Sequence, residues 1–327
     1  MNTRRKILAT AVAALTTSML AGPVLAQAWP TKPIRIVVGF APGGGTDIVA
    51  RALAPKMSEI LGQSILIENR SGAAGTIGAD VVAKSPADGY TLLMGHSNSN
   101  AIAPYVLPKV PFNAATDFTP ITYVGYVPNI LVLHPSIPAK TVPELISLAK
   151  NNPAQMTYGS SGIGSTQHLA GALFSKIAKV QMNHVPYKGS GQAIVDLMAG
   201  QINMNFDTLP PVLPHIRAGK LKPLAISTPK RLSILPDVPT FEEVGIKGFE
   251  VTNWYSVMGP KNMPKDMVLK IDAAVRAAMN DPKIKTTLDA QGLQTSGPAT
   301  PDEFSVFLKA ELNKYSKLVK ELNVKAE

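Results

Sequence analysis

The sequence of 327 residues contains no cysteine. Without a thiol the chain forms no disulfide, holds no metal through a thiolate and carries no lipid on an N-terminal cysteine. Aromatic residues are also few, at 6%, and charged residues make up 17%, whereas 45% of the chain is hydrophobic. That balance is typical of globular proteins, and the length allows about two domains. The five histidines lack metal-ligand spacing, so we expect neither a metal nor a cofactor.

After residue 28 no run is long and apolar enough to span a bilayer. Residues 1–28 themselves have the pattern of a secretory signal peptide: Arg4, Arg5 and Lys6 precede a mostly apolar run, and Ala26-Gln27-Ala28 fits small-x-small cleavage, as does Val24-Leu25-Ala26. A membrane anchor is the alternative, but the run is short and ends in a cleavage pattern. We therefore predict a soluble mature protein exported to the periplasm.

Positive charge exceeds negative charge, with 32 Lys and Arg against 22 Asp and Glu. Loss of the three basic residues of the signal lowers the net charge from +10 to 10 − 3 = +7. The basic residues are scattered and not interleaved with aromatics, whereas a nucleic-acid surface needs a clustered stripe. We expect no nucleic-acid partner, and a positive surface that is either simply solvated or attractive to a small anion.

The most informative stretch runs from Ile34 to Asp47. An apolar strand, 34–38, is followed by Pro42 and three glycines, and Thr46-Asp47 then begin a helix. A strand, a tight glycine turn and a helix aim unpaired N–H groups and the positive end of the helix at one point. The stretch predicts an anion site, and a plain strand-to-helix turn is the alternative.

Strands and helices alternate along the chain, which predicts parallel sheets with crossover helices. Beyond the first unit we expect strands at 64–68, 90–94, 121–127, 130–133, 156–158, 181–185, 202–206 and 221–226, with 249–258 extended. We expect helices at 77–84, 141 onward, 167–178 and 192–199, with 101–120 irregular and a loop with a short helix at 233–245. Three helices, 267–279, 282–290 and 301–322, should return to cover the first domain.

The opening design recurs at 156–178, where a short strand, the loop Gly159 to Thr166 and a helix follow one another. The loop nearly matches a phosphate loop, but Ser165 stands at the lysine position, so nucleotide hydrolysis loses its main charge partner. The remaining N–H and hydroxyl donors suit a carboxylate, or they are only a helix cap. Two copies of one unit predict two α/β domains that face each other.

Gly95-His96-Ser97-Asn98-Ser99 nearly matches the nucleophile elbow of serine hydrolases, although Ser99 replaces the last glycine. We expect no helix directly after it, because Pro104 and Pro108 interrupt the pattern. Ser97 is better interpreted as a hydrogen-bond donor to a ligand, with a secreted serine hydrolase as a rival. Asp207, at the end of a strand, either caps a helix or contacts a ligand.

Several motifs resemble one family. Trp29 to Asp47 is similar to the mature N-terminus of Bug-type receptors, the extracytoplasmic solute-binding proteins of tripartite tricarboxylate transporters. Further matches are Glu68-Asn69-Arg70, Gly72-Ala73-Ala74-Gly75, Pro86 to Leu92, Tyr158 to Gly162, Val185 to Gly189, Arg217 to Leu221 and Pro236 to Thr240. The resemblance spans about residues 29–260, and the helical C-terminus is compatible with it.

The resemblance implies a two-lobed periplasmic-binding-protein fold with a strand hinge: residues 29–125 plus 252–327 in lobe 1 and 126–251 in lobe 2. It implies no catalysis, a small organic carboxylate held between the lobes, and delivery to a membrane permease by a monomer. A binding protein that feeds a sensory system is an alternative. The ligand-binding residues it implies are Phe40, Ala41, Gly43, Gly44, Gly45, Thr46, Asp47, His96, Ser97, Asn98, Ser160, Ser161, Gly164, Ser165, Thr166, Tyr187, Lys188 and Asp207.

Overall fold

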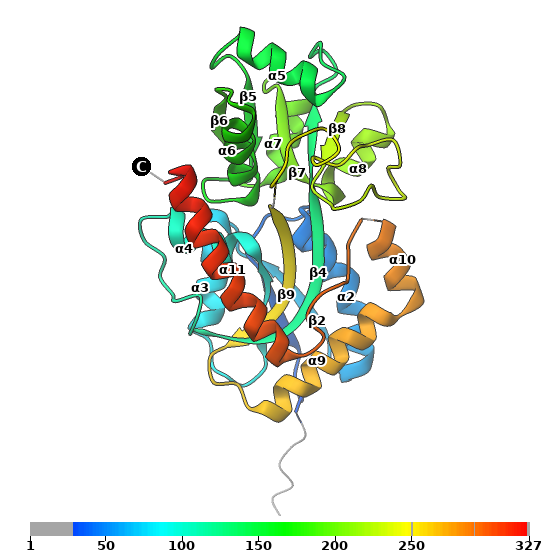
Figure 1. The fold of residues 1–327 in the computed structure, drawn as a ribbon. Coiled ribbons are helices and arrows are strands. Elements are labelled where there is room, and N and C mark those ends of the chain that lie inside the picture. Colours follow the sequence, from blue (N-terminus) through cyan, green and yellow to red (C-terminus); the bar gives the residue numbers. More distant parts are fainter. Residues whose placement is uncertain (1–28, 250, 291, 326–327) are drawn as a thin grey trace, which may run out of the picture.

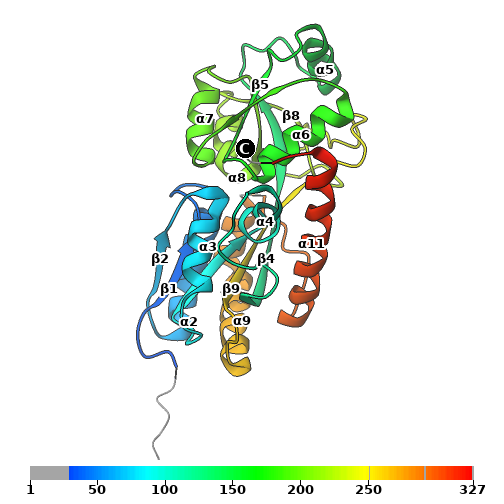
Figure 2. The same ribbon diagram turned by 90° about the vertical axis from the view of Figure 1, so that its left-hand side faces the viewer.

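A computed structural model describes residues 29–325 except 250 and 291, so the predicted signal peptide lies outside the described residues. The strands are β1 (Ile34–Val38), β2 (Ile65–Asn69), β3 (Thr91–His96), β4 (Phe118–Leu133), β5 (Thr157–Ser160), β6 (Asn183–Pro186), β7 (Met204–Thr208), β8 (Lys222–Ile226) and β9 (Thr252–Pro260). Their order is β2-β1-β3-β9-β4-β7-β5-β6, with β8 also paired to β4. Figures 1 and 2 show two α/β halves, one above the other.

The helices of the first half are α2 (Gly45–Leu61), the short turn η1 (Ala73–Gly75), α3 (Thr76–Ala83), η2 (Asn98–Ile102) and α4 (Ala103–Val106). Those of the second half are α5 (Val142–Asn151), α6 (Thr166–Ala178), α7 (Ser190–Met198) and α8 (Leu209–Arg217). The chain ends with α9 (Lys265–Asn280), α10 (Pro282–Ala290) and α11 (Pro301–Leu322). In each half, parallel strands connected through helices form part of the sheet, as the alternating pattern predicted.

Strand β4 connects the two halves (Figure 1). Up to Pro128 it pairs with β9, and from Asn129 it pairs with β7 and β8. The prediction of two strands, 121–127 and 130–133, was wrong, because the strand continues through Pro128. A proline lacks an N–H group, but here it lies where the strand changes partners, and the next N–H, of Asn129, donates to Ser227 Oγ at 2.8 Å.

Three local predictions were also wrong. A helix does begin directly after Ser97, and Pro104 is tolerated because it lies in the first turn of α4, where its missing N–H has no helical partner. The short helix expected within 233–245 is a series of turns. Helix α8 was not predicted; it follows β7 directly and contains three prolines, two of them in its first turn.

The C-terminal helices cover the first half, as expected. Helices α9 and α10 pack against α2, and α11 packs on β4 and α4. Helix α11 also reaches the second half, where its C-terminal end packs against α6 and Glu321 pairs with Lys176 at 2.6 Å. Figure 2 shows α11 running along much of the first half, with its upper end beside α6. It is therefore a second connection between the halves, besides the strands.

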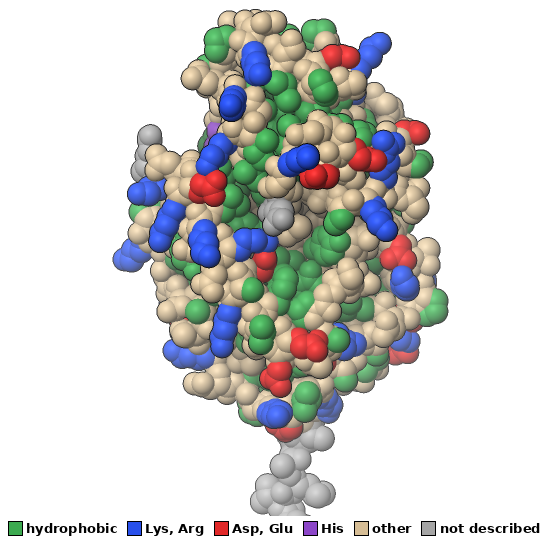
Figure 3. Space-filling model, in the orientation of Figure 1, with side chains coloured by type: hydrophobic (Ala, Val, Ile, Leu, Met, Phe, Trp, Pro, Cys, Tyr) green, Lys and Arg blue, Asp and Glu red, His purple; other side chains and the backbone are tan. Residues whose placement is uncertain are grey.

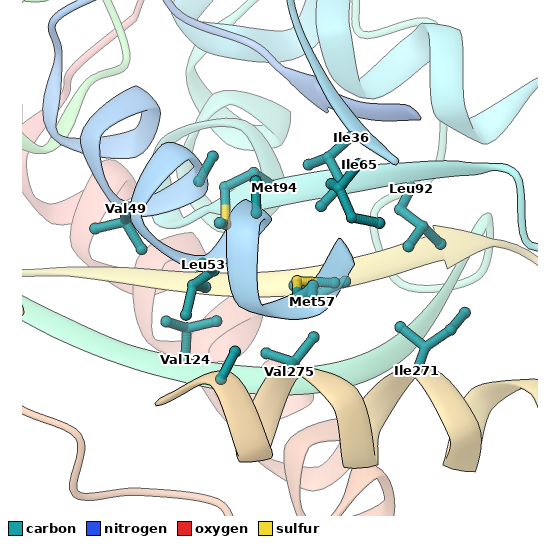
Figure 4. Close-up of a cluster of buried hydrophobic side chains, with 14 of the residues drawn as sticks. Ile36, Val49, Leu53, Met57, Ile65, Leu92, Met94, Val124, Ile271 and Val275 are labelled. Atoms are coloured by element: carbon teal, nitrogen blue, oxygen red, sulfur yellow. The ribbon is translucent and has the colours of Figure 1, made fainter. Parts of the chain in front are cut away.

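The core of the first half lies between the sheet and helices α2 and α9. Leu53 and Met57 from α2, Ile271 and Val275 from α9, and Leu92 from β3 are fully buried in it (Figure 4). These residues recur at helical spacing on α2 and α9, which is why both helices turn one apolar stripe toward the sheet. The packing fixes α2, and with it the position of its N-terminus.

We predict that Leu53→Ala lowers the free energy of unfolding by about 2–5 kcal/mol, because it leaves a cavity among fully buried side chains. Urea unfolding followed by circular dichroism measures the change. Ile60→Ala on the same helix is the matched control, since Ile60 is 42% exposed, and it should cost less than about 0.5 kcal/mol. Equal losses in the two variants would contradict this account of the core.

Candidate functional site

A cavity of about 310 Å³ lies between the two halves. The first half contributes the turn before α2, together with Ser71, His96, Asn98 and Tyr255. The second half contributes Ser161, Gln167, Thr208 and the stretch from Lys188 to Gln192. Because the lining comes from both halves, a molecule held here contacts both at once.

The N-terminus of α2 forms one side of this cavity. Gly44, Gly45 and Thr46 line it, and the N-cap residue, Gly44, makes no side-chain cap. The first N–H groups of a helix have no partner within the helix. They leave a partial positive charge at the cavity wall, which favours an anion. The close approach requires glycine at position 45, where an added Cβ would lie 2.4 Å from the Tyr255 hydroxyl oxygen.

A second uncapped helix N-terminus faces the same cavity, that of α7. Gly189, Ser190, Gly191 and Gln192 line the cavity, and no side chain caps this helix at Gly189. Sequence reasoning missed this element, although Val185 to Gly189 was among the family motifs. The available signal was the pair of glycines, Gly189 and Gly191, on either side of a helix-starting serine.

The sequence analysis placed the second anion-binding turn at α6 instead. The structure shows that this N-terminus is already occupied by the protein's own groups. Thr166 N donates to Asn98 Oδ1 at 2.8 Å, and Ser165 Oγ accepts from His168 N at 3.2 Å. Thr166 Oγ1 also donates to Asn253 of β9. These bonds tie α6 to the first half of the molecule.

Of the residues expected in the site, half line the cavity: Phe40, Ala41, Gly44, Gly45, Thr46, His96, Asn98, Ser161 and Lys188. The others lie behind or beside it: Gly43, Asp47, Ser97, Ser160, Gly164, Ser165, Thr166, Tyr187 and Asp207. Gln167, Thr208 and Tyr255 line it without having been expected. Tyr255 comes from β9, and no local motif links it to the loops that it contacts.

His96 is held as a neutral ring in the cavity wall. Burial lowers its pKa to about 3, and its ring lies between those of Phe40 and Tyr255, with centroids 5.1 and 5.2 Å away. Nδ1 accepts from Asn98 N at 2.9 Å, so the proton of the neutral ring is on Nε2. His96 is therefore a hydrogen-bond donor without a full charge.

The Tyr255 hydroxyl is the unsatisfied polar group of the cavity. Tyr255 is fully buried, and among the described residues its hydroxyl has no partner in full hydrogen-bonding geometry, although the Thr208 hydroxyl is near enough to affect its pKa. Burial raises the pKa of this phenol, the Asp207 carboxylate raises it further, and the Thr208 hydroxyl opposes the rise. A buried hydroxyl without a partner costs free energy, which a polar ligand group in the cavity would recover.

Two carboxylates stand behind the lining. Asp47 accepts from Gly43 N at 3.0 Å and Arg51 Nε at 2.9 Å, and so fixes the glycine turn. Burial alone would raise its pKa, but the hydrogen bonds from Arg51, Gly43 and Asn69 hold that pKa below its usual range. Burial raises the pKa of Asp207, against hydrogen bonds from Ser190, Gln167 and Thr208. Both residues position other groups and do not line the cavity.

The geometry does not favour the serine hydrolase alternative. Ser97 is fully buried, and the nearest ring nitrogen, His96 Nδ1, is 3.4 Å away and already accepts the Asn98 N–H. A closer pair exists elsewhere, since Ser160 Oγ lies 2.6 Å from His184 Nε2. Ser160 is also fully buried, so neither serine is accessible to a substrate.

A smaller cavity of about 290 Å³ adjoins the first and shares Phe40, Ser161 and Lys188 with it. Tyr187 lies here, and its hydroxyl donates to Asp196 Oδ2 at 2.8 Å. Burial and Asp196 raise the pKa of Tyr187 to about 12. Within residues 29–325, apart from 250 and 291, no cluster of three or more acidic, histidine or cysteine side chains could hold a metal ion.

On the face drawn in Figure 3, Lys and Arg side chains are interspersed with acidic ones, and further Lys and Arg side chains lie along α11.

In the part of the chain that the structure describes, no helix has both the length and the apolar character needed to cross a membrane.

The chain matches the family described as "Tripartite tricarboxylate transporter family receptor" over residues 49–324. Protein BugT of Bordetella pertussis is 36% identical over 312 residues, covering 95% of each chain. A structure from R. palustris with adipate has a TM-score of 0.87 and 37% identity, covering 91% of this chain and 99% of that one. MatC from Rhodopseudomonas palustris with bound malate has a TM-score of 0.85 and 32% identity, covering 89% and 100%.

The fold, with its cavity between two α/β halves, is that of the periplasmic binding proteins, which confirms the predicted fold class. The chain belongs to the tripartite tricarboxylate transporter receptor family, whose members include the Bug proteins. Its relatives are solute-binding receptors, so the class of function is the binding of a small solute.

We predict that His96, His168 and His184 stay neutral well below pH 6.5, because burial lowers their pKa values to about 3, 4 and 3, helped at His184 by the facing His168 ring. The unfolded chain binds protons below pH 6.5 that the folded chain does not. Each histidine therefore costs up to roughly 1.4 kcal/mol of stability per pH unit as the pH falls from 6.5 toward 4. The NMR chemical shifts of the ring protons of these three histidines should stay constant from pH 8 to 5. Titration curves of these protons with midpoints near pH 6.5 would refute the prediction.

Proposed function

We propose that the protein is exported to the periplasm, captures a small organic carboxylate in the cavity between its halves, and delivers it to the permease of a tripartite transporter. The observation that carries the proposal is the pair of uncapped helix N-termini, of α2 and α7, in one cavity. Relatives that were solved with adipate and malate support it.

The donors of the cavity are sufficient for useful affinity. A micromolar dissociation constant corresponds to about −8 kcal/mol. Hydrogen bonds to a charged group give roughly 1.5–3 kcal/mol each, and each helix terminus adds about 0.3–2 kcal/mol. The cavity supplies enough donors for micromolar affinity without a buried cation. They are the N–H groups of Gly45 and Thr46, the N–H groups of α7, the His96 ring and the Tyr255 hydroxyl. Lys188, which is exposed at the mouth, attracts the anion from outside.

Ligand binding should bring the halves together around β4 and β9, with residues 29–125 plus 252–327 as one lobe and 126–251 as the other. The closed state then has more contacts with the ligand than the open state, so the ligand shifts the population toward closure. We propose that a monomer in this closed state is what the membrane partner recognises, and that the protein has no catalytic activity.

Thermal unfolding with a panel of carboxylates, including adipate and malate, tests the binding step. A ligand at 100 times its dissociation constant adds about 2.7 kcal/mol of stability. No shift with any carboxylate, together with turnover of an ester, would favour the hydrolase alternative.

We predict that Gly45→Ala weakens carboxylate binding at least ten-fold, because its methyl group would collide with the Tyr255 hydroxyl and intrude on the N-terminus of α2. Thr46→Val, which removes one hydroxyl from the same turn, should also weaken binding. Thr286→Val is the control, since the exposed Thr286 hydroxyl donates to Pro282 O within α10, away from the cavity lining. Isothermal titration measures all three, and wild-type affinity in both site variants would remove the α2 turn from the site.

Delivery is tested in cells. Fractionation should recover the mature protein from the periplasm, and deletion of its gene should abolish uptake of the carboxylate that binds in vitro. Normal uptake with a lost transcriptional response to that carboxylate would instead identify a sensory role.

A further inference from the structure

The buried Asp207 gathers hydrogen-bond donors from four residues around the cavity. Its Oδ1 accepts from Thr208 N at 2.7 Å and Gln167 Nε2 at 3.3 Å, and its Oδ2 accepts from Ser190 Oγ at 2.5 Å and Asn205 Nδ2 at 3.0 Å. With the longer bond from Thr208 Oγ1, at 3.4 Å, all of these groups donate to Asp207 and fill its roughly four acceptor positions. Burial raises the pKa of Asp207, but this set of donors favours the ionised carboxylate over the neutral acid. Nothing is left on Asp207 for a ligand to bind directly.

This arrangement decides whether two hydroxyl groups that line the cavity can donate or only accept a hydrogen bond. Ser190 gives its single hydrogen to Asp207, and the Thr208 hydroxyl also donates to Asp207, at 3.4 Å. A hydroxyl group that has given away its hydrogen has only lone pairs left to offer. Toward the ligand, Ser190 Oγ and Thr208 Oγ1 are therefore acceptors.

One of these acceptors, Thr208 Oγ1, lies close to Gly45 at the start of α2, and Ser190 lines the same cavity. A Cβ added at Gly45 would be 3.5 Å from Thr208 Oγ1 and 2.4 Å from the Tyr255 hydroxyl. An anion on the N-terminus of α2 would therefore have a hydrogen-bond acceptor within the same part of the cavity. The buried Tyr255 hydroxyl, which has no partner in full hydrogen-bonding geometry among the described residues, lies at the same point and can either donate or accept a hydrogen bond.

We propose that the ligand carries a hydrogen-bond donor on the carbon atom next to its carboxylate, as 2-hydroxy and 2-amino acids do. The proposal rests on the carboxylate site proposed above and narrows the ligand class. The carboxylate occupies the donors of α2, and the neighbouring hydroxyl or ammonium group donates to Thr208 Oγ1 and Ser190 Oγ. A ligand without that group leaves buried acceptors unpaired, which is costly.

Isothermal titration with matched ligands tests the preference. The series are propionate, lactate and alanine; succinate, malate and aspartate; and butyrate against its 2-hydroxy and 4-hydroxy derivatives. In the series that binds, the 2-substituted member should bind at least ten-fold more tightly than the unsubstituted one, and the 4-hydroxy compound should gain nothing. Equal affinity for substituted and unsubstituted members would overturn the proposal and leave carboxylate binding intact. No binding by any carboxylate would overturn both.

Variants locate the preference in the structure. Ser190→Ala and Thr208→Val should each lower the ratio of affinities between 2-hydroxy and unsubstituted ligands several-fold, whatever the change in absolute affinity, since both residues line the cavity. Ser175→Ala is the matched control, because Ser175 donates to Gly171 O within α6, away from the cavity, and it should keep the full ratio. If both site variants fold, as judged by circular dichroism, and keep the wild-type ratio, the assignment is wrong.

Discussion

The site depends on a few backbone N–H groups at the starts of α2 and α7, which no side chain caps and which lie where the two halves meet. Helix N-termini are normally capped by side chains, as α6 is by Ser165 and α11 is by Thr300. At α2 and α7 glycine stands at the cap instead. The glycines leave the positive ends of both helices open to the cavity, and the packing of α2 against α9 and the sheet holds one of them in place.

The groups around these N-termini supply polarity without charge. His96 is a neutral donor, and the Tyr255 hydroxyl has no partner in full hydrogen-bonding geometry among the described residues. The Asp207 carboxylate is already hydrogen-bonded to donors of the protein, such as Ser190 and Thr208. A permanently charged arginine would bind an anion more tightly, but a binding protein must also release its ligand. Neutral donors and helix ends suit reversible capture. The bonds that Thr166 donates to Asn98 and Asn253 join the halves at the same place, so occupancy of the cavity and the relative position of the halves are physically connected.

The sequence predicted what is local. The strand, glycine turn and helix start at 34–47 were predicted correctly as structure because they are contiguous, and the alternation of strands and helices indicated the fold class. The role of α6 could not be judged in the same way. Its loop has the right composition, but Asn98, 68 residues earlier in the chain, occupies the N–H that the loop would offer a ligand. Tyr255 and Thr208 were missed for the same reason: tertiary packing, not a motif, brings them to Gly45. Pro128 misled the strand prediction because its effect depends on which neighbour the strand has there.

A crystal structure with a bound carboxylate tests the central claim most directly. The account predicts carboxylate oxygens within hydrogen-bond distance of the backbone N–H groups of Gly45 and Thr46, with the rest of the ligand reaching toward the N-terminus of α7. A carboxylate bound instead to a lysine or arginine side chain, or to the N–H groups at Gly164 to Thr166 after displacement of Asn98, would contradict it.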